Sequence, residues 1–296
     1  MEIVLYILIA LAAALVSVMI ISAYENRHFV VRSYTVAADK LPPVFDGYRI
    51  AVISDLHNQE FGRKNEQLLA AIREQSPDIA ICAGDILVGK PGADFTVAAS
   101  LVHSLAQEYP VYLAMGNHEY RLKIYPDTYE DMWERYYAET SKKDNKNDVI
   151  WLDNETGYIV RDNQKIAITG LSIDRMYYKR FQKHEMSAEY VEQLCPFDDR
   201  SVYQILLAHN PDYFPAYAAY GADLVISGHV HGGMVRLPLF GGVISPRLRL
   251  FPKYDRGEFT IGKSTMLLNA GLGNHTIRFR VNNRPELMII TLKRTG

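Results

Sequence analysis

Two stretches predict the architecture of this protein, RIAVISDLH at residues 49–57 and DIAICAGD at residues 78–85. In each, a short unbroken apolar run ends in side chains that can bind a ligand. A run of this length without polar alternation is typical of a strand that is buried on both faces. Three further runs of this kind cover residues 111–115, 202–208 and 223–227.

Helical patterns at residues 64–76 and 94–108 follow the first two runs. Strands that alternate with helices predict βαβ units and a layered α/β domain. Later in the chain, the pattern predicts a hairpin at residues 154–174 and further strands at 265–269 and 286–293.

Composition limits the partners of this domain. The chain has 296 residues, of which 48% are hydrophobic and 22% charged, with a net charge of -2. A protein that binds duplex nucleic acid by general electrostatics is usually basic, so this composition disfavours a nucleic-acid partner. The two cysteines, Cys82 and Cys195, suggest neither a disulfide framework nor a thiolate metal site.

Residues 3–23 contain no charge, no proline and no glycine. As a helix they would cover the ~30 Å hydrocarbon core of a bilayer. A cleaved signal peptide is the alternative, with Ile21-Ser22-Ala23 as its processing site, but the run exceeds the usual ~7–15 residues and no Lys or Arg precedes it. We therefore predict a transmembrane anchor at residues 1–24, a connector at 25–45 with an extended stretch at 29–36, and one domain at 46–296.

The charged residues that flank the apolar run predict how the anchor is oriented in the membrane. Arg27 and Arg32 come after the apolar run, whereas Glu2 is the only charged side chain before it. The positive-inside tendency then places the domain in the cytoplasm, with an extracytoplasmic domain as the alternative.

The strand–helix rhythm stops at residues 120–148, which are rich in charge and aromatic side chains, Trp133 among them. One interpretation is an inserted helical segment whose aromatic face packs on the domain. The other is a lid or flap that contacts substrate, because the segment directly follows a group of polar side chains.

Polar side chains end all five apolar runs. Open α/β sheets form their ligand crevice at the carboxyl ends of the strands, so these side chains are expected to meet. Adjacent glycines would let the backbone turn there. In chain order, the side chains are Asp55 and His57, Asp85, Asn117, His118 and Glu119, His209, and His229 and His231.

A single Asp or His after a strand is usually a cap or a satisfied core group. So many ionisable groups at strand ends, however, would repel one another or stay unpaired without cations. Carboxylate, imidazole and amide oxygen are ligands for first-row divalent ions. Their number exceeds what one octahedral ion can hold and fits two ions, which together stabilise the attacking and leaving oxygens of an in-line displacement.

In this order, Asp-x-His at 55–57, Gly-Asp at 84–85, Gly-Asn-His-Glu at 116–119, a lone His209 and Gly-His-x-His-Gly-Gly at 228–233 resemble the calcineurin-like metallophosphoesterase superfamily. The resemblance runs from about residue 49 to residue 292. Its bacterial membrane-associated branch, the YkuE-like phosphoesterases, is similar in further stretches: Ile-Ser-Asp-Leu-His-Asn at 53–58, Gly-Leu-Gly at 271–273, and Arg278-Phe279 before Pro285-Glu286.

The resemblance implies a four-layer αββα sandwich of two mixed sheets flanked by helices, preceded here by the anchor. It also implies two divalent metal ions per chain (Mn, Fe or Zn) and in-line attack by a metal-bridging hydroxide on a phosphate ester or pyrophosphate. By resemblance, the metal ligands are Asp55, His57 and His231 for one ion, Asn117, His209 and His229 for the other, and Asp85 for both.

By the same resemblance, His118 acts on the leaving group. Many relatives carry a second aspartate three residues after the bridging one, where this chain has Val88. The partner of His118 is therefore not supplied from that position, and Glu119 is a candidate substitute.

The sequence leaves open the type of reaction, the substrate class and the role of a group of basic residues. The alternatives to a phosphohydrolase are a metal-dependent hydrolase of another bond and a non-catalytic membrane-bound scaffold. A tethered enzyme favours a lipid-linked phosphate substrate over a soluble one. Basic residues after the last motif would form either an anion clamp or a solvated face balanced by Asp255 and Glu258: Arg236, Arg247, Arg249, Lys253 and Arg256.

Overall fold

The direction of successive side chains along the strands divides the domain into layers. In the computed structural model, which describes residues 1–179, 182, 184–237, 241–244, 250–274 and 278–296, Ile50 and Val52 of β2 (Arg49–Ile53) point into one core, whereas Ala51 and Ile53 point into another. Neighbouring side chains of a strand face opposite sides of the sheet, so an unbroken apolar run means that both sides are covered.

The second sheet follows the same rule. In β8 (Gln204–Ala208), Ile205 and Leu207 join the core between the sheets, whereas Leu206 and Ala208 pack with helices on the outer side. Helices, sheet, sheet and helices therefore lie in that order, and the predicted four-layer sandwich is confirmed.

Both sheets are mixed. The first has the order β1-β14-β2-β3-β4-β5, in which β2 to β5 run parallel and β14 is antiparallel to β2. The second has the order β12-β13-β9-β8-β7-β6, with antiparallel strands at both edges. The remaining strands of the first sheet are β1 (Val30–Ala38), β3 (Ile79–Ala83), β4 (Val111–Ala114), β5 (Val149–Leu152) and β14 (Glu286–Arg294). Those of the second are β6 (Glu155–Arg161), β7 (Gln164–Leu171), β9 (Leu224–Ser227), β12 (Gly257–Ile261) and β13 (Ser264–Leu268), and β10 (Val235–Leu237) pairs with β11 (Gly241–Ile244).

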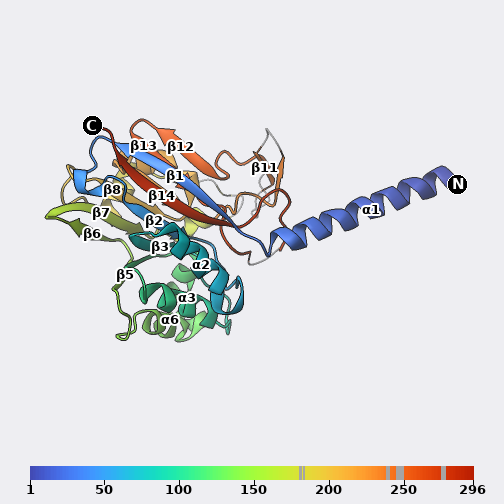
Figure 1. Cartoon of the computed structure of the whole chain (residues 1–296), viewed down its shortest axis with the longest axis horizontal. Coiled ribbons are helices and arrows are strands. Elements are labelled where there is room, and N and C mark those ends of the chain that lie inside the picture. The colour runs from blue at the N-terminus through green and yellow to red at the C-terminus, as the bar shows by residue number, and fades with distance from the viewer. Residues whose placement is uncertain (180–181, 183, 238–240, 245–249, 275–277) are drawn as a thin grey trace.

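The helices cover the two outer faces. Those that lie with the first sheet are α2 (Glu66–Gln75), α3 (Thr96–Ala106), α4 (Asn117–Ile124), α5 (Pro126–Tyr129) and α6 (Met132–Thr140), and α2, α3 and α6 gather on one side in Figure 1. Those of the second sheet are α7 (Ala188–Leu194) and α8 (Phe214–Tyr220). Short 3₁₀ helices are η1 (Pro43–Phe45), η2 (Arg63–Asn65), η3 (Arg175–Tyr178) and η4 (Pro211–Tyr213).

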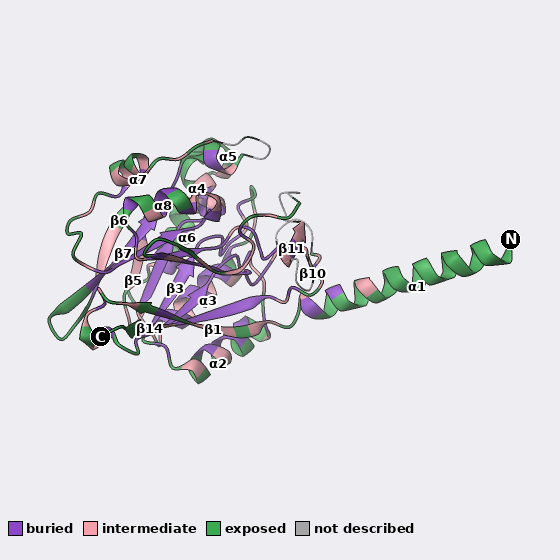
Figure 2. Ribbon diagram, turned by 90° about the horizontal axis from the view of Figure 1, so that it is seen from above, coloured by how far each residue is buried: buried purple, intermediate pink, exposed green. Residues whose placement is uncertain are grey.

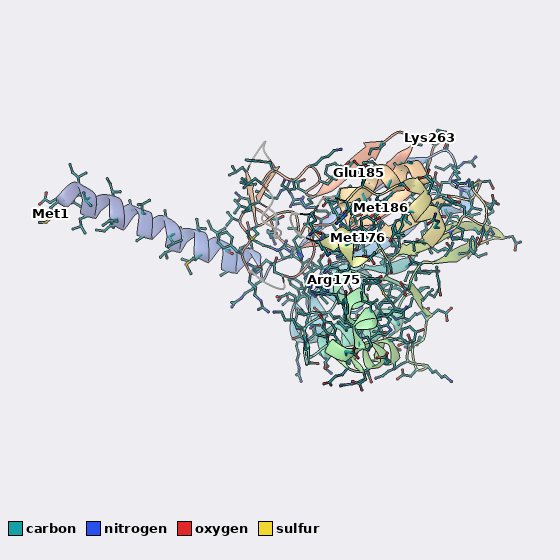
Figure 3. All side chains as sticks on the ribbon, turned by 180° about the vertical axis from the view of Figure 1, so that it is seen from behind. Met1, Arg175, Met176, Glu185, Met186 and Lys263 are labelled. Carbon is teal, nitrogen blue, oxygen red and sulfur yellow. The ribbon has the colours of Figure 1, made fainter. Side chains whose placement is uncertain are left out.

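Helix α1 (Glu2–Glu25) projects away from the domain, with Met1 at its far end (Figures 1 and 3). It is long and apolar enough to cross a membrane. Figure 2 shows that buried residues in α1 occur only near the domain, and these are Ser22 and Glu25. The exposed apolar surface along the rest of the helix fits a surrounding bilayer.

The stretch expected as a connector contributes to the first sheet. Strand β1 pairs in parallel with β14 over its nine residues, from Val30 opposite Glu286 to Ala38 opposite Arg294. Only about four residues separate α1 from this strand, since α1 ends at Glu25 and β1 begins at Val30. The anchor is therefore joined to the domain by a short segment.

The segment expected as an inserted helix folds as α4, α5 and α6. Pro126 starts α5, and Glu130 has a φ of 53°, so the chain turns twice between helices. Tyr136 is fully buried, and Trp133 packs edge-on against Trp151 with ring centroids 5.2 Å apart. These contacts support the packing interpretation of the aromatic side chains.

Removal of β1 should destabilise the domain. We expect a chain that begins at residue 41 to melt about 6–12 °C below one that begins at residue 29, which corresponds to roughly 3 kcal/mol for a domain of this size. The reason is that β14 would lose one of its two hydrogen-bonded neighbours. Both chains lack α1, so thermal unfolding followed by circular dichroism isolates the strand. Equal melting temperatures would contradict a structural role for β1.

Candidate metal centre

Five strands from both sheets deliver the predicted polar side chains to one place. Strands β2, β3 and β4 of the first sheet end just before Asp55, Asp85 and Asn117. Strands β8 and β9 of the second sheet end just before His209 and the 229–231 segment. The structure brings their side chains together in three groups whose ligand atoms lie within 4.8 Å of one another: Asp55, His57 and His231; His57, Asp85 and His118; and Asp85, His209 and His229.

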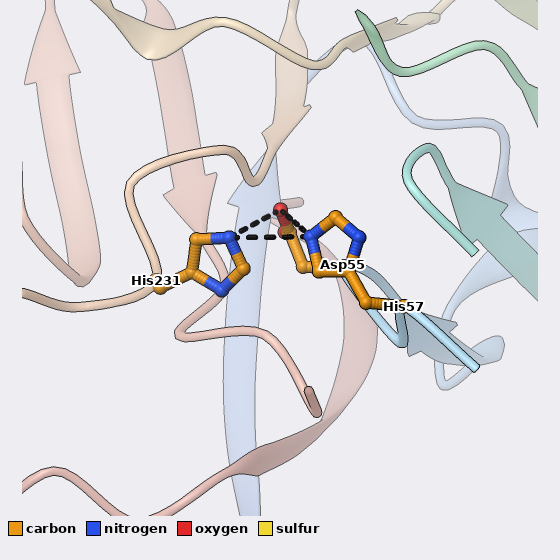
Figure 4. Close-up of side chains that lie close together, drawn as sticks. All are labelled: Asp55, His57 and His231. Atoms are coloured by element: carbon orange, nitrogen blue, oxygen red, sulfur yellow. Dashed lines mark hydrogen bonds and ion pairs between the residues drawn. The ribbon is translucent and has the colours of Figure 1, made fainter. Parts of the chain in front are cut away.

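The first group is compact (Figure 4). Oδ1 of Asp55 lies 3.4 Å from Nε2 of His231 and 3.9 Å from Nε2 of His57, and the two imidazole nitrogens are 3.4 Å apart. Two of these residues follow β2 and the third follows β9, so this group forms only when the two sheets are packed together.

Asp85 occupies the middle of the site. Its Oδ2 lies 3.2 Å from Nε2 of His209 and 3.9 Å from Nε2 of both His57 and His118. The carboxylate thus belongs to two of the groups at once, and His209 also approaches Asp55 Oδ1 at 3.7 Å.

Hydrogen bonds fix the orientation of three imidazoles. Nδ1 of His57, His209 and His231 lies 3.3, 2.9 and 3.0 Å from the carbonyl oxygens of Leu87, Ala83 and Gly273. A carbonyl oxygen can only accept, so each Nδ1 carries the hydrogen and each Nε2 turns toward the carboxylates. This is the arrangement that prepares a neutral histidine to bind a metal ion.

Asn117 also fits a cation site. Within the described part of the chain, its Oδ1 is a buried oxygen without a hydrogen-bond partner. A buried amide oxygen without a donor is costly, and a cation would satisfy it. The donor set of carboxylate, imidazole and amide oxygen therefore suits first-row divalent ions.

The pKa values show how strongly the site favours positive charge. Burial alone would lower the pKa of His209, but the carboxylates of Asp85 and Asp55 raise it to about 10. Burial raises the pKa of Asp55 to about 6. Burial would also raise the pKa of Asp85, but His118 and His209 hold it well below its usual range. Either protons or metal ions can supply this charge.

His118 differs from His57, His209 and His231. Its Nδ1 accepts a hydrogen bond of 2.8 Å from the backbone N–H of Gly89, so in the neutral ring the hydrogen is on Nε2. The imidazole therefore presents a donor, not a lone pair, on the side of Asp85. Val88 has no polar side chain that could bind this ring. The backbone N–H of the next residue, Gly89, contacts it instead.

Glu119 directs its carboxylate to the backbone instead of to His118. It accepts hydrogen bonds from the N–H groups of Asp85, Ile86 and Gly116 at 2.8, 2.7 and 3.0 Å. Burial, followed by the charge of Asp85, raises its pKa to about 7. The expectation that Glu119 substitutes as the partner of His118 is not met by these contacts, because they make Glu119 a brace for the loop that carries Asp85.

Several site residues adopt a backbone conformation that L-residues avoid. The φ angles are 49° for Asp55, 47° for His57, 55° for Asp85, 71° for His229 and 52° for His231. Each such residue costs on the order of 1–3 kcal/mol. Sequence reasoning assigned the sharp turns to the adjacent glycines, but the chain also turns at the candidate ligands themselves.

Gly228 and Gly116 serve close packing in this site. A Cβ on Gly228 would overlap Ser54 Oγ and Asp55 Oδ2, and a Cβ on Gly116 would overlap the carboxylate of Asp85. Both glycines therefore allow a backbone to lie directly against a candidate metal ligand.

Two of the basic residues after the last motif, Arg236 and Arg256, make contacts that serve the structure. Arg236 pairs with Asp255 at 2.8 Å and donates to the carbonyl of Gly232 at 2.9 Å. Arg256 donates to Asn283 Oδ1 at 3.3 Å. Arg247 and Arg249 lie outside the described residues. Arg280 and Asn283, which no motif singled out, contact the carbonyls that surround His231.

Several known proteins are similar to this chain in sequence. Residues 48–233 match the family model of the calcineurin-like phosphoesterases. The "Uncharacterized metallophosphoesterase YkuE" of Bacillus subtilis is 26% identical over 92% of this chain and 89% of its own length. The "Phosphodiesterase YaeI" of Escherichia coli is 24% identical over 83% of this chain and 82% of its own. The "UDP-2,3-diacylglucosamine pyrophosphatase LpxG" of Chlamydia muridarum is 24% identical over 85% of this chain and 86% of its own.

Gly228→Ala should disrupt the site without unfolding the domain. The added methyl group would push Asp55 out of the first group of ligand atoms, so we expect the bound metal to fall to about half or less of the wild-type content. Gly157→Ala is the matched control, because an added Cβ on this residue of β6 meets only ordinary contacts, the nearest being Leu152 Cδ2 at 3.5 Å. Metal analysis by mass spectrometry measures the effect, and equal metal content in both variants would show that Asp55 needs no such space.

Proposed function

Since this chain belongs to the calcineurin-like phosphoesterase family and is a phosphohydrolase, we propose that it cleaves a phosphate ester or pyrophosphate bond with two divalent metal ions. One observation carries the proposal: three buried imidazoles, each oriented by a main-chain carbonyl, aim Nε2 at two buried carboxylates. Such a cluster needs cations.

The proposed ligands follow the groups of the site. Asp55, His57 and His231 hold one ion, and Asn117, His209 and His229 hold the other. Asp85 binds both, which its central place supports. Bound ions of this kind lower the pKa of water and stabilise the attacking and leaving oxygens of an in-line displacement.

The remaining side chains orient the reaction. The Nε2–H of His118 is placed to donate to an oxygen of the substrate, and Gly89 holds its ring in that orientation. We assign His118 to the leaving group, where a hydrogen bond or proton stabilises the charge that develops as the bond to phosphorus breaks. Glu119 keeps Asp85 in place through the backbone.

We further propose a lipid-linked phosphate or pyrophosphate as the substrate. The short segment between α1 and β1 keeps the domain at the membrane surface, where lipid substrates are concentrated. The name of the Chlamydia relative describes action on a lipid pyrophosphate, which supports this class. For the side of the membrane we propose the cytoplasm, because Arg27 follows α1 and the anionic leaflet attracts such charge.

Substrate assays with the wild-type chain and with Asp85→Asn test the proposed function. The full chain in mixed micelles should hydrolyse phosphate diesters and lipid pyrophosphates, with higher kcat/KM for lipids than for their soluble headgroups. Asp85→Asn should lose at least about 10³-fold in rate and most of its metal, because one ligand is shared by both ions. Asp162→Asn makes the same change at an exposed turn and should behave as wild type.

The outcomes separate the alternatives. Cleavage of amides but not phosphates would indicate a hydrolase of another bond, and metal binding without any turnover would indicate a scaffold. Asp85→Asn with two ions and normal turnover would contradict the dinuclear assignment.

His118→Ala should slow catalysis while metal content stays unchanged. Loss of a leaving-group donor typically costs ~10²–10⁴-fold in rate. The loss should be smaller for nitrophenyl phosphates, whose leaving group needs little stabilisation. His103→Ala, on helix α3, is the control. Equal losses for good and poor leaving groups, or loss of an ion, would remove His118 from this role.

A further inference from the structure

The last turn of α1 is bound into the domain. The carboxylate of Glu25 accepts hydrogen bonds from the backbone N–H groups of Asn282 and Asn283, at 3.0 and 2.9 Å. The hydroxyl of Ser22 accepts one from the N–H of Arg280 at 3.0 Å. Glu25 and Ser22 are only 8% and 4% exposed, whereas the helix before them is almost entirely exposed.

Asn283 continues this contact to the metal centre. Its side-chain amide donates to the carbonyl oxygen of His231 at 2.7 Å and to that of Gly233. A single residue therefore joins Glu25, through its main chain, to the segment that carries His231, through its side chain. Gly232 lies in that segment, and a Cβ there would overlap Asn283 Oδ1.

Arg280 provides a second route to the same imidazole. It is 1% exposed, and its guanidinium donates to the carbonyls of Gly271 and Gly273 at 3.2 and 3.0 Å. The carbonyl of Gly273 is also the group that accepts the hydrogen bond from Nδ1 of His231. The position of Arg280 thus bears directly on the orientation of the His231 ring.

A flexible tether would not need these contacts. Burial of a carboxylate at the end of an apolar helix is unfavourable unless donors satisfy it, and any small residue could end a simple anchor. Here the donors are main-chain amides of the segment that braces His231. Hydrogen bonds behind a metal ligand set its orientation and basicity.

We propose that the last turn of α1, through Glu25 and Ser22, is a positioning element for His231 and so sets the affinity of one of the two metal sites. This inference rests on the proposed metal-dependent function. It makes membrane anchoring and metal binding parts of one structure: cleavage after Ala23 would remove Ser22, and displacement of the helix end would reach His231 through Asn283 and Arg280.

Titration of the metal-stripped full chain in detergent micelles with Mn²⁺ tests the proposal. The electron paramagnetic resonance signal of free Mn²⁺ reports each binding event without any need for activity. In Glu25→Gln, which keeps the size of the side chain, we expect one of the two sites to weaken by about 10–100-fold. The other site should keep its affinity, and excess Mn²⁺ should restore kcat. Glu2→Gln makes the same change at the far end of the helix and should match wild type.

The outcomes are distinguishable. Wild-type affinity at both sites in Glu25→Gln, or equal weakening of both sites, would overturn the positioning role. If Glu25→Gln does not fold, Ser22→Ala removes a single acceptor, and unchanged affinity in that variant would overturn the role as well. Failure of the wild-type chain to bind Mn²⁺ at all would instead overturn the proposed function.

Discussion

Asp85 places a carboxylate oxygen within 3.9 Å of three imidazoles, and the rest of the site depends on the charge that this arrangement requires. Burial of two carboxylates is unfavourable unless a positive charge lies next to them. Here that charge would lie between the carboxylate oxygens and the imidazole nitrogens that face them. The sandwich supplies the geometry because the ends of β2 and β3 in one sheet meet the ends of β8 and β9 in the other. The fold thus concentrates charge that only cations or protons can balance.

The local backbone shows the cost of this arrangement. Asp55, Asp85 and His231 have positive φ angles, and Gly116 and Gly228 lie where no side chain would fit. Strain of this kind persists only where surrounding contacts hold it, and here Glu119 and the packed strands do so. Fixed ligands need little rearrangement when metal and substrate bind, which favours catalysis.

The anchor also takes part in the domain. Strand β1 follows α1 after a short segment and completes the edge of the first sheet, and the end of α1 contacts the loop behind His231. These contacts fix the end of α1 relative to the candidate metal centre. They are consistent with the proposal that the substrate phosphate lies at the headgroup level.

The layered α/β class and the central strands could be predicted from the sequence alone, whereas β1 lies in the stretch that was expected to be a connector. Unbroken apolar runs such as residues 49–53 require cover on both faces, so they indicate a sheet between two layers before any contact is known. The order of Asp, His and Asn after those runs also predicted which side chains would meet, because strand ends are local features that the chain carries with it.

The orientation of these side chains follows from contacts between segments that are distant in sequence. The roles of the imidazoles depend on which backbone group faces Nδ1, a carbonyl for His209 and an N–H for His118, and these groups belong to segments distant in sequence. The same holds for Glu25. In the sequence it marks the end of the predicted anchor, and its carboxylate gains hydrogen bonds only when residues 282–283 fold against it. Hydrogen bonds between distant segments have no periodicity along the chain, so no pattern in the sequence predicts them.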